Sequence, residues 1–429
     1  MSLTTRRHFL KVSALGLAGC NATPPKPVEK VKAPPHVVII GGGFAGTIAA
    51  KYLRRFGEEI RITLIEARKS YISCPASNWV FAGLHDVTAL THDYQELAKK
   101  GVNIVHDVVN QVLPVQQEIL TKSGSKITYD RLIIASGVDM RWDTIEGYTP
   151  EVSTDFPHAW KSGNQLLTLY KQIKDMKNGR TVVISAPEGD CTARHAIYER
   201  ASLIAYYLRK HKRRSKVFIL DGQEEFTDQA LYEKAWKRFY RFGSSRRSIL
   251  QRIPASKGGK ITAFDAKRKV ITTSTGEKLK ATVFNIIPPQ HAGFITRRAQ
   301  LTDESGWCPV DPITYESLLH KNIHVIGDAS KLDSLPKTGF MANVQAKLCA
   351  SAVADLILER PIVSAPQWTH AYYSLISPNH GLSHIDVYKR DAQKNIIEVA
   401  QNTKVSHNPK LEAAYAQSWY TNVMNEMFR

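Results

Sequence analysis

Apolar residues in the chain fall into short continuous runs, separated by segments with helical spacing. The clearest runs lie at 36–40, 60–65, 181–185 and 216–221. Runs of this length without alternation are typical of strands that are buried on both faces of a parallel sheet. Residues 47–56, between the first two runs, repeat their apolar positions at helical intervals. The pattern therefore predicts an α/β protein that is built on parallel sheets.

A glycine-rich loop follows the first run directly. The loop Gly41-Gly42-Gly43-Phe44-Ala45-Gly46 contains G-x-G-x-x-G, and the second run ends at Glu66, twenty residues after Gly46. Such glycines let the backbone approach a pyrophosphate at a helix N-terminus, and the acid accepts hydrogen bonds from ribose hydroxyls. This order of strand, glycines, helix, strand and acid predicts a dinucleotide site formed by Gly41, Gly43, Phe44, Ala45, Gly46 and Glu66.

Composition narrows the class of protein. The 429 residues suffice for two or three domains, and 43% hydrophobic content excludes wholesale disorder. The sequence contains no run of 18 apolar residues, so it predicts no ordinary membrane-spanning helix. The excess of 58 Lys and Arg over 39 Asp and Glu gives a net charge of +19, which suits nucleic acid, a membrane surface or an acidic protein. Composition does not choose among these partners.

The N-terminus predicts export. Residues 5–11, TRRHFLK, match a twin-arginine signal, and residues 17–20, LAGC, place small residues before a cysteine. We expect residues 1–20 to be a cleaved signal with lipidation at Cys20; the alternative is an amphipathic helix. Residues 21–35 contain five prolines and predict a stiff tether of about 40–50 Å. The expected location is the periplasm, which argues against nucleic acid as a partner.

Two later segments indicate that the dinucleotide is FAD. Residues 129–137, YDRLIIASG, resemble the strand and "ATG" turn of flavoproteins with two dinucleotide domains, and residues 323–329, IHVIGDA, resemble their late "GD" motif. The resemblance implies cofactor contacts at Ala135, Gly137 and Asp328, with Asp328 at the ribitol. It also implies two Rossmann-like domains: an FAD-binding domain at 36–149 and 300–360, a second domain at 150–299, and a C-terminal interface domain at 361–429.

The inserted domain lacks a phosphate cradle of its own. The run at 181–185 leads into Ala186-Pro187-Glu188-Gly189-Asp190-Cys191, which has one glycine and no G-x-G-x-x-G. We therefore expect FAD to bind without NAD(P)H. The chain also contains no C-x-x-C-H haem motif.

The surroundings of the cysteines carry a closer resemblance. Cys74 and Cys308 lie in SYISCPASN (70–78) and SGWCPVDP (305–312), and FPHAWK (156–161), PKTGF (336–340) and SWY (418–420) complete the set. Over residues 36–429 the chain resembles the flavoprotein subunit of flavocytochrome c sulfide dehydrogenase, a relative of sulfide:quinone reductase.

This resemblance assigns roles to residues. It implies a covalent flavin thioether at Cys74, a redox disulfide between Cys191 and Cys308, and a proton-handling acid at Glu199. Further implied cofactor contacts are Val109, Lys337 and Trp419. Simpler readings stay open: Cys74 as a buried thiol, Glu199 as a helix-surface glutamate and Trp419 as a core tryptophan.

One departure from the family pattern affects the disulfide. Cys191 lies seven residues before Tyr198 instead of five, and TARHA at 192–196 replaces a proline-rich run. A disulfide requires Cα atoms within about 7 Å, so the sequence leaves this pairing open. Cys349, in a helix-like AKLCA run, is most simply a core thiol.

Three functions follow as expectations. The first is a sulfide dehydrogenase that passes electrons through FAD to a c-type cytochrome; the alternatives are a sulfide:quinone reductase and a non-catalytic flavoprotein partner or chaperone. Two basic stretches, 209–216 and 234–247, suit an acidic cytochrome or an anionic membrane, with a solvated helix end as the alternative. Lys212, Arg213 and Arg214 lie at the centre of the first stretch.

Overall fold

The computed structural model describes residues 33–161, 163–189, 191–244, 247–332, 335–362, 366–391, 396–403 and 408–429. The predicted signal, Cys20 and most of the tether lie outside the described residues. Residues Pro35–Arg429 form one compact unit.

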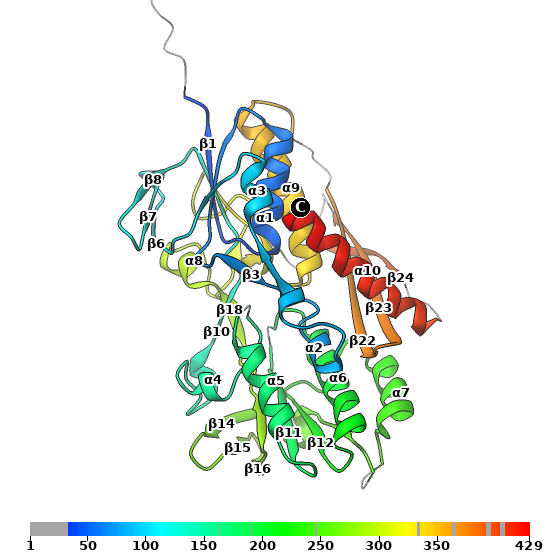
Figure 1. Ribbon diagram of the computed structural model, residues 1–429. Helices are drawn as coiled ribbons and strands as arrows, with labels where there is room; N and C mark the ends of the chain where they lie inside the picture. The colour runs from blue at the N-terminus through cyan, green and yellow to red at the C-terminus, as the bar shows by residue number, and fades with distance from the viewer. Residues whose placement is uncertain are drawn as a thin grey trace, which may run out of the picture. The chain divides into compact units, whose positions relative to one another are not determined.

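A five-stranded parallel sheet contains the first apolar runs (Figure 1). Its strand order is β20 (Ile323–Val325), β9 (Arg131–Ile134), β1 (His36–Ile40), β2 (Arg61–Ile65) and β5 (Asn103–Val105). Helix α1 (Phe44–Phe56) packs against β1 and β2, and α9 (Gly339–Ile357) packs against α1. The strands and the helix that the sequence predicted at residues 36–65 are confirmed, with α1 beginning three residues early.

A second parallel sheet holds the later runs. Its order is β13 (Leu250–Ile253), β12 (Lys216–Asp221), β11 (Thr181–Ala186) and β17 (Val283–Asn285). Its accompanying helices are α5 (Gln165–Asp175), α6 (His195–His211) and α7 (Gln229–Tyr240). The predicted α/β class with two Rossmann-like domains is confirmed; the predicted domain boundaries stay predictions.

Smaller elements join and flank the two sheets. Strands β10 (Val138–Met140) and β18 (Gln290–Ala292) pair where the chain leaves the first sheet and returns from the second. The other strands are β3 (Ser70–Ile72), β4 (Thr91–Asp93), β6 (Val109–Leu113), β7 (Glu118–Thr121), β8 (Lys126–Thr128), β14 (Ile261–Asp265), β15 (Val270–Thr273), β16 (Lys278–Lys280), β19 (Cys308–Pro309) and β21 (Ser330–Lys331). The short helices are α2 (Trp79–Ala82), α3 (Gln95–Lys99), α4 (Val152–Asp155) and α8 (Phe294–Arg298).

The C-terminal part forms an antiparallel sheet and a helix. Strands β22 (Gln367–Ser377), β23 (His380–Asp391) and β24 (Ile396–Thr403) lie next to one another, and α10 (Pro409–Phe428) packs on β22 and β23. Strand β22 also contacts α6 and α9, so it joins elements of both parallel sheets. Within the described part of the chain, no helix combines the length and the apolar character needed to cross a membrane.

Candidate active site

A cavity of about 300 Å³ lies at the carboxyl ends of the first sheet's strands. This edge is where α/β proteins bind ligands. The predicted site residues that line the cavity are Gly41, Gly43, Phe44, Ala45, Glu66, Cys74, Ala135, Gly137, Glu199, Asp328 and Trp419. Gly46, Val109, Cys191, Cys308 and Lys337 do not line it. Val109 is instead the buried first residue of β6, paired with Thr121.

The three fingerprint glycines act in different ways. Gly41 has φ +104°, and a Cβ there would meet the Ala135 carbonyl oxygen at 2.4 Å. A Cβ on Gly46 would meet the Gly41 carbonyl oxygen at 1.8 Å, so Gly46 allows α1 to approach the loop and contributes by packing. Gly43 has no atom within 4 Å of the position of a Cβ and leaves the N-terminus of α1 open to the cavity. Such an end binds phosphate.

Glu66 lies at the end of β2 and fixes the glycine loop. Its Oε2 accepts a hydrogen bond from the Gly42 backbone N–H at 2.8 Å, and its Oε1 accepts one from the Arg68 backbone N–H at 3.0 Å. The carboxylate also faces the cavity, where ribose hydroxyls are expected.

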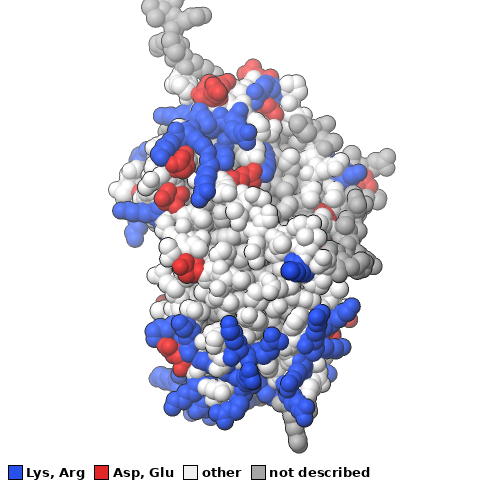
Figure 2. Space-filling view, turned by 45° about the vertical axis from the view of Figure 1, so that its right-hand side comes forward, with Lys and Arg blue, Asp and Glu red and all other residues white. Residues whose placement is uncertain are grey.

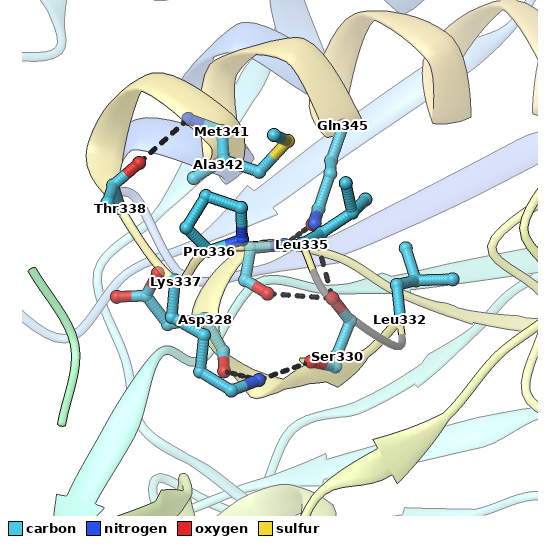
Figure 3. Close-up of a pocket in the computed structure, with 11 residues that line it drawn as sticks. Asp328, Ser330, Leu332, Leu335, Pro336, Lys337, Thr338, Met341, Ala342 and Gln345 are labelled. Atoms are coloured by element: carbon cyan, nitrogen blue, oxygen red, sulfur yellow. Dashed lines mark hydrogen bonds between the residues drawn. The ribbon is translucent and has the colours of Figure 1, made fainter. Parts of the chain in front are cut away.

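Asp328 follows β20 in a turn that Lys337 supports (Figure 3). Lys337 Nζ donates to the carbonyl oxygens of Asp328 at 3.1 Å and Ser330 at 2.6 Å. Burial raises the pKa of Asp328 to about 6, and Lys337 opposes that rise. Lys337 thus holds the turn without lining the cavity. Thr338 caps α9 beside it, with its Oγ1 accepting from the Met341 N–H at 3.2 Å.

The cavity wall fits FAD. Ser136 Oγ is buried there and has no hydrogen-bond partner among the described residues, and the half-buried Asp328 carboxylate faces the same space. Ribityl hydroxyls would satisfy such groups, and the open N-terminus of α1 suits the pyrophosphate. Trp419 stacks on Phe340 with ring centroids 6.3 Å apart, so an aromatic pair forms part of the wall.

Cys74 lies in the cavity wall, two residues after β3. Its Sγ donates to the Trp160 carbonyl oxygen at 3.9 Å. Burial raises the pKa of the Cys74 thiol to about 11, while the cations of Arg68 and Arg200 oppose this. Trp160 Nε1 donates to the Thr192 carbonyl oxygen at 3.1 Å and so connects Cys74's neighbourhood to the loop before α6. The motif at 156–161 carries part of the family resemblance, but the sequence did not identify Trp160 as a residue of the site.

Glu199 is a buried hydrogen-bond acceptor, which rules out the helix-surface reading. Its Oε2 accepts from Asn78 Nδ2 at 2.8 Å, and its Oε1 accepts from Trp79 Nε1 at 3.0 Å and the Leu375 N–H at 2.9 Å. Burial raises the pKa of Glu199, and these donors oppose the rise. The carboxylate therefore joins the segment after Cys74 to α6 and β22. Its predicted proton-handling role stays a prediction.

Arg200 is a buried cation that sequence reasoning missed. Its guanidinium donates to Asn78 Oδ1 at 2.8 Å, Asn285 Oδ1 at 2.9 Å and the Ala159 carbonyl oxygen at 2.7 Å. Burial lowers the pKa of Arg200 to about 10, while Cys74, Glu199 and Cys191 act to raise it. The positive charge thus lies within electrostatic range of two predicted reactive cysteines.

The predicted Cys191–Cys308 disulfide is not formed in this structure. Cys308 is a fully buried thiol in β19, and burial raises its pKa to about 12. Cys191 lines a second cavity of about 250 Å³, and its Sγ accepts a hydrogen bond from Gln290 Nε2 at 3.6 Å. Ala193, where the family pattern has its cysteine, has φ +46° and borders both cavities. The two-residue slide therefore leaves Cys191 outside the first cavity. Cys349 is a buried thiol, as predicted.

The second cavity contains histidines that the sequence did not single out. His195 borders both cavities and stacks on Tyr372, with ring centroids 4.0 Å apart. His384 bonds Asp228 Oδ2 through Nδ1 at 2.9 Å and Asp386 Oδ2 through Nε2 at 2.8 Å. Two carboxylates on one ring favour the doubly protonated imidazolium. These contacts join residues far apart in the sequence, so no local pattern reveals them.

The first basic stretch is only partly a free surface. Lys212 is buried, and its Nζ donates to the carbonyl oxygens of Ile173 (2.8 Å), Lys174 and Met176. It caps the C-terminal end of α5, so the prediction that includes it in a docking face is wrong. Arg213 and Arg214 are exposed.

Three family models match the chain. The model for the sulfide dehydrogenase [flavocytochrome c] flavoprotein chain, central part, matches residues 166–288. The model for the flavin-binding part of flavocytochrome c sulphide dehydrogenase matches residues 364–428. A pyridine nucleotide-disulphide oxidoreductase model matches residues 35–184. Together they cover the second parallel sheet, the first parallel sheet except β20, and the C-terminal part.

Individual relatives agree with these models. A sulfide dehydrogenase [flavocytochrome c] flavoprotein chain from Chlorobaculum thiosulfatiphilum is 48% identical over 45 residues, which is 10% of this chain and 94% of the relative. The mitochondrial sulfide:quinone oxidoreductase of Dictyostelium discoideum is 24% identical over 343 residues, 79% of this chain and 74% of the relative. The solved sulfide:quinone oxidoreductase of Aquifex aeolicus shares the fold, with a TM-score of 0.69, 18% identity and coverage of 91% of this chain and 92% of that one. The chain therefore belongs to the family of flavocytochrome c sulfide dehydrogenase flavoprotein chains.

Proposed function

We propose that this protein is an exported, FAD-dependent sulfide dehydrogenase that passes electrons to a c-type cytochrome. The observation that carries the proposal is the Cys74 thiol in the wall of the cavity formed by the G-x-G-x-x-G loop, Glu66 and Asp328. The names of the relatives, which are sulfide dehydrogenase and sulfide:quinone oxidoreductase, support sulfide as the substrate.

Bound FAD would supply a two-electron acceptor at this site. The open N-terminus of α1 at Gly43 binds the pyrophosphate, Glu66 the ribose and Asp328 the ribityl chain. Cys74 holds the flavin through a thioether. The cations of Arg68 and Arg200 oppose the rise in the pKa of Cys74 that burial causes, and so favour the thiolate, the form that would react.

Covalent attachment has a direct test. In a denaturing gel, flavin fluorescence should migrate with the polypeptide of the wild-type protein and be lost in Cys74→Ala. Cys349→Ala, at another buried thiol, is the matched control and should keep the fluorescence. Release of all flavin from the wild-type protein by acid would contradict the attachment.

Cys191 and Cys308 would carry the sulfur chemistry once oxidised to a disulfide. Hydrosulfide attacks one sulfur, the disulfide bond breaks, and a persulfide is left on one cysteine and a thiolate on the other. Both cysteines adjoin the Lys337 loop, since the Ala193 N–H donates to the Lys337 carbonyl oxygen at 2.8 Å and the charge of Lys337 acts on Cys308. Non-reducing peptide mapping of the oxidised protein should find this pair. An unpaired Cys191 would favour the non-catalytic flavoprotein.

The electron acceptor distinguishes the proposal from quinone reduction, which the names of several relatives favour. A charged protein acceptor is steered by the net charge of the chain, which is +16 once Arg6, Arg7 and Lys11 are removed with the signal. Cytochrome reduction should slow as the Debye length falls from about 10 Å at 0.1 M salt to about 3 Å at 1 M. Sulfide oxidation that couples to a soluble quinone analogue, independently of salt, would identify a quinone reductase.

Export and anchoring remain part of the proposal. The twin-arginine pattern at residues 5–11 and the lipobox at 17–20 support a periplasmic protein that is lipidated at Cys20. Arg6→Lys with Arg7→Lys should retain the protein in the cytoplasm. A periplasmic product from that variant would rule out the twin-arginine route.

A further inference from the structure

Exposed cations gather at the end of the molecule that carries α5, α6 and α7. Figure 2 shows Lys and Arg dominating this end, which lies at the bottom of Figure 1. We call it the basic end; its exposed cations are Lys171, Lys174, Lys177, Arg180, Arg209, Lys210, Arg213, Arg214, Lys234, Lys237, Arg238 and Arg241. Residues 171–180, 209–216 and 234–241 contain a single acid, Asp175.

Printed contacts make these segments one continuous surface. The Arg214 N–H donates to Asn178 Oδ1 at 3.0 Å, and the Gly179 N–H donates to Ser215 Oγ at 2.9 Å, so the turns after α5 and α6 lie together. Arg209 Nη1 donates to the Phe239 carbonyl oxygen at 3.2 Å and joins α6 to α7. Lys234, Lys237 and Arg238 lie at positions i, i+3 and i+4 of α7, which places them on one helix face, and Arg241 follows directly after the helix.

The basic end lies on the opposite side of the second sheet from the flavin cavity. Its turns precede β11 and β12, at the amino ends of parallel strands, whereas the loop after β11 leads at the carboxyl end to Ala193 and the cavity. Along α6, His195 borders the cavity and His211 lies about 25 Å farther on, at 1.5 Å per residue. A cytochrome docked on the basic end would have the second sheet between its haem and the flavin. An electron acceptor therefore does not suit this surface.

We propose that the basic end is a docking surface for the anionic phospholipid headgroups of a membrane. A broad array of cations on three helices matches a continuous negative plane, and each cation near such a plane strengthens binding by about fivefold. This orientation turns the carboxyl edge of the second sheet, and with it the flavin cavity, away from the bilayer. The site then faces the aqueous phase, where a soluble acceptor diffuses.

Vesicle sedimentation tests the docking surface. The full chain with Cys20→Ser, which removes any acyl anchor, is mixed with phosphatidylcholine vesicles with or without about one-third phosphatidylglycerol. We expect binding only to the anionic vesicles and its loss at 1 M salt. The variant K177Q/K210Q/R213Q/R214Q should bind at least tenfold more weakly, with unchanged FAD content and melting temperature. The matched control R55Q/K99Q/K122Q/K126Q removes four exposed cations elsewhere and should bind within twofold of the parent.

Three results would overturn the proposal. The first is no preference for anionic vesicles. The second is equal weakening by the two fourfold variants, which would mean that net charge alone attracts the protein. The third is a chain that ignores vesicles but binds an acidic c-type cytochrome through Arg213 and Arg214, which would assign the basic end to a protein partner. None of these results depends on sulfide oxidation.

Discussion

The loops that follow β1 and β11 occupy equivalent places in two Rossmann-like sheets, yet the acids at the ends of the next strands, β2 and β12, have different surroundings. After β1, Gly43 leaves the N-terminus of α1 bare and Glu66 faces a cavity at the end of the next strand. After β11, the corresponding acid is Asp221, at the end of β12, and it is fully buried. Its Oδ2 accepts from Tyr198 OH at 2.8 Å and Arg252 Nε at 2.7 Å.

Side chains hold the second loop in place beside the second cavity. Arg194 donates to the carbonyl oxygens of Pro187 and Gly189, and Tyr198 stacks on Phe226 with ring centroids 3.6 Å apart. A Cβ on Gly222 would meet the Glu188 backbone nitrogen at 2.5 Å, so the loop packs tightly on the end of β12. The difference teaches that the same fold can leave the acid facing a cavity, as at Glu66, or hold it with neighbouring side chains, as at Asp221. We expect only the first arrangement to bind a dinucleotide.

The largest expected effect comes from comparing a single alanine substitution in each of the two loops. Gly46→Ala places a Cβ 1.8 Å from the Gly41 carbonyl oxygen, so we expect FAD content to fall at least tenfold. In Gly189→Ala the new Cβ meets no atom within 4 Å, but residue 189 has φ +75°, which an alanine adopts less easily than a glycine. We expect the free energy of unfolding to fall by about 1 kcal/mol without loss of FAD. Flavin absorbance per polypeptide measures both. Equal flavin loss in the two variants would contradict the claim that only the first loop contributes to FAD binding.

Asp221→Ala tests whether the acid of the second loop is structural. Its removal leaves the buried side chain of Arg252 without its counter-ion, and we expect the free energy of unfolding to fall by about 3–5 kcal/mol. Asp265→Ala removes an exposed ion pair to Arg268 and is the control, with an expected loss below about 1 kcal/mol. Urea denaturation gives both values.

A separate test concerns nucleotide binding at the end of the second parallel sheet. Fast flavin reduction by NADH, in the wild-type protein or in Asp221→Ala, would show that this end of the sheet is a nucleotide site.

Glu199→Gln tests the hydrogen bonds by which the Glu199 carboxylate joins α6 to the wall of the first cavity. The new amide group would face Asn78 Nδ2, which now donates to the carboxylate, and we expect a loss of about 1–3 kcal/mol. If Glu199 handles a proton, as predicted, one limb of the pH profile of sulfide-dependent flavin reduction should disappear in this variant. An unchanged profile would show that the carboxylate only joins Asn78, Trp79 and Leu375. Glu96→Gln, at an exposed helix position, is the control.

The smallest expected effect concerns the C-terminal sheet, which contacts Asp228 at the N-terminus of α7 through His384. Hydrogen bonds to Asp228, together with Asp386, raise the pKa of His384 to about 9, above its ordinary 6.5. The stabilisation is therefore complete below pH 6.5 and is lost as the pH rises through about 9. Partial solvent screening limits it to about 1–2 kcal/mol. Melting temperatures of the wild-type protein and His384→Gln should converge above that pH; a constant difference would contradict the imidazolium.

Sequence patterns predicted the first loop well because its determinants are contiguous. Strand, glycines, helix, strand and Glu66 lie within about thirty residues, and their order alone implies their geometry. The partners of Glu199 lie at positions 78, 79 and 375, so its hydrogen bonds are invisible in the sequence. Lys212 looks like part of a basic surface until the carbonyl oxygens at the end of α5 are placed around it. The cavity that Cys191 faces depends likewise on the tertiary packing of β22 and β23.

The central claim is that sulfide delivers electrons to a flavin held in the first cavity. Anaerobic addition of sulfide to the oxidised holoprotein tests it most directly, with the visible flavin absorbance as the readout. The account predicts that the absorbance bleaches with one sulfide per flavin, and that Cys308→Ser prevents bleaching while Cys349→Ser does not. A flavin that stays oxidised in excess sulfide, in a protein with intact FAD content, would contradict the claim and leave a non-catalytic flavoprotein.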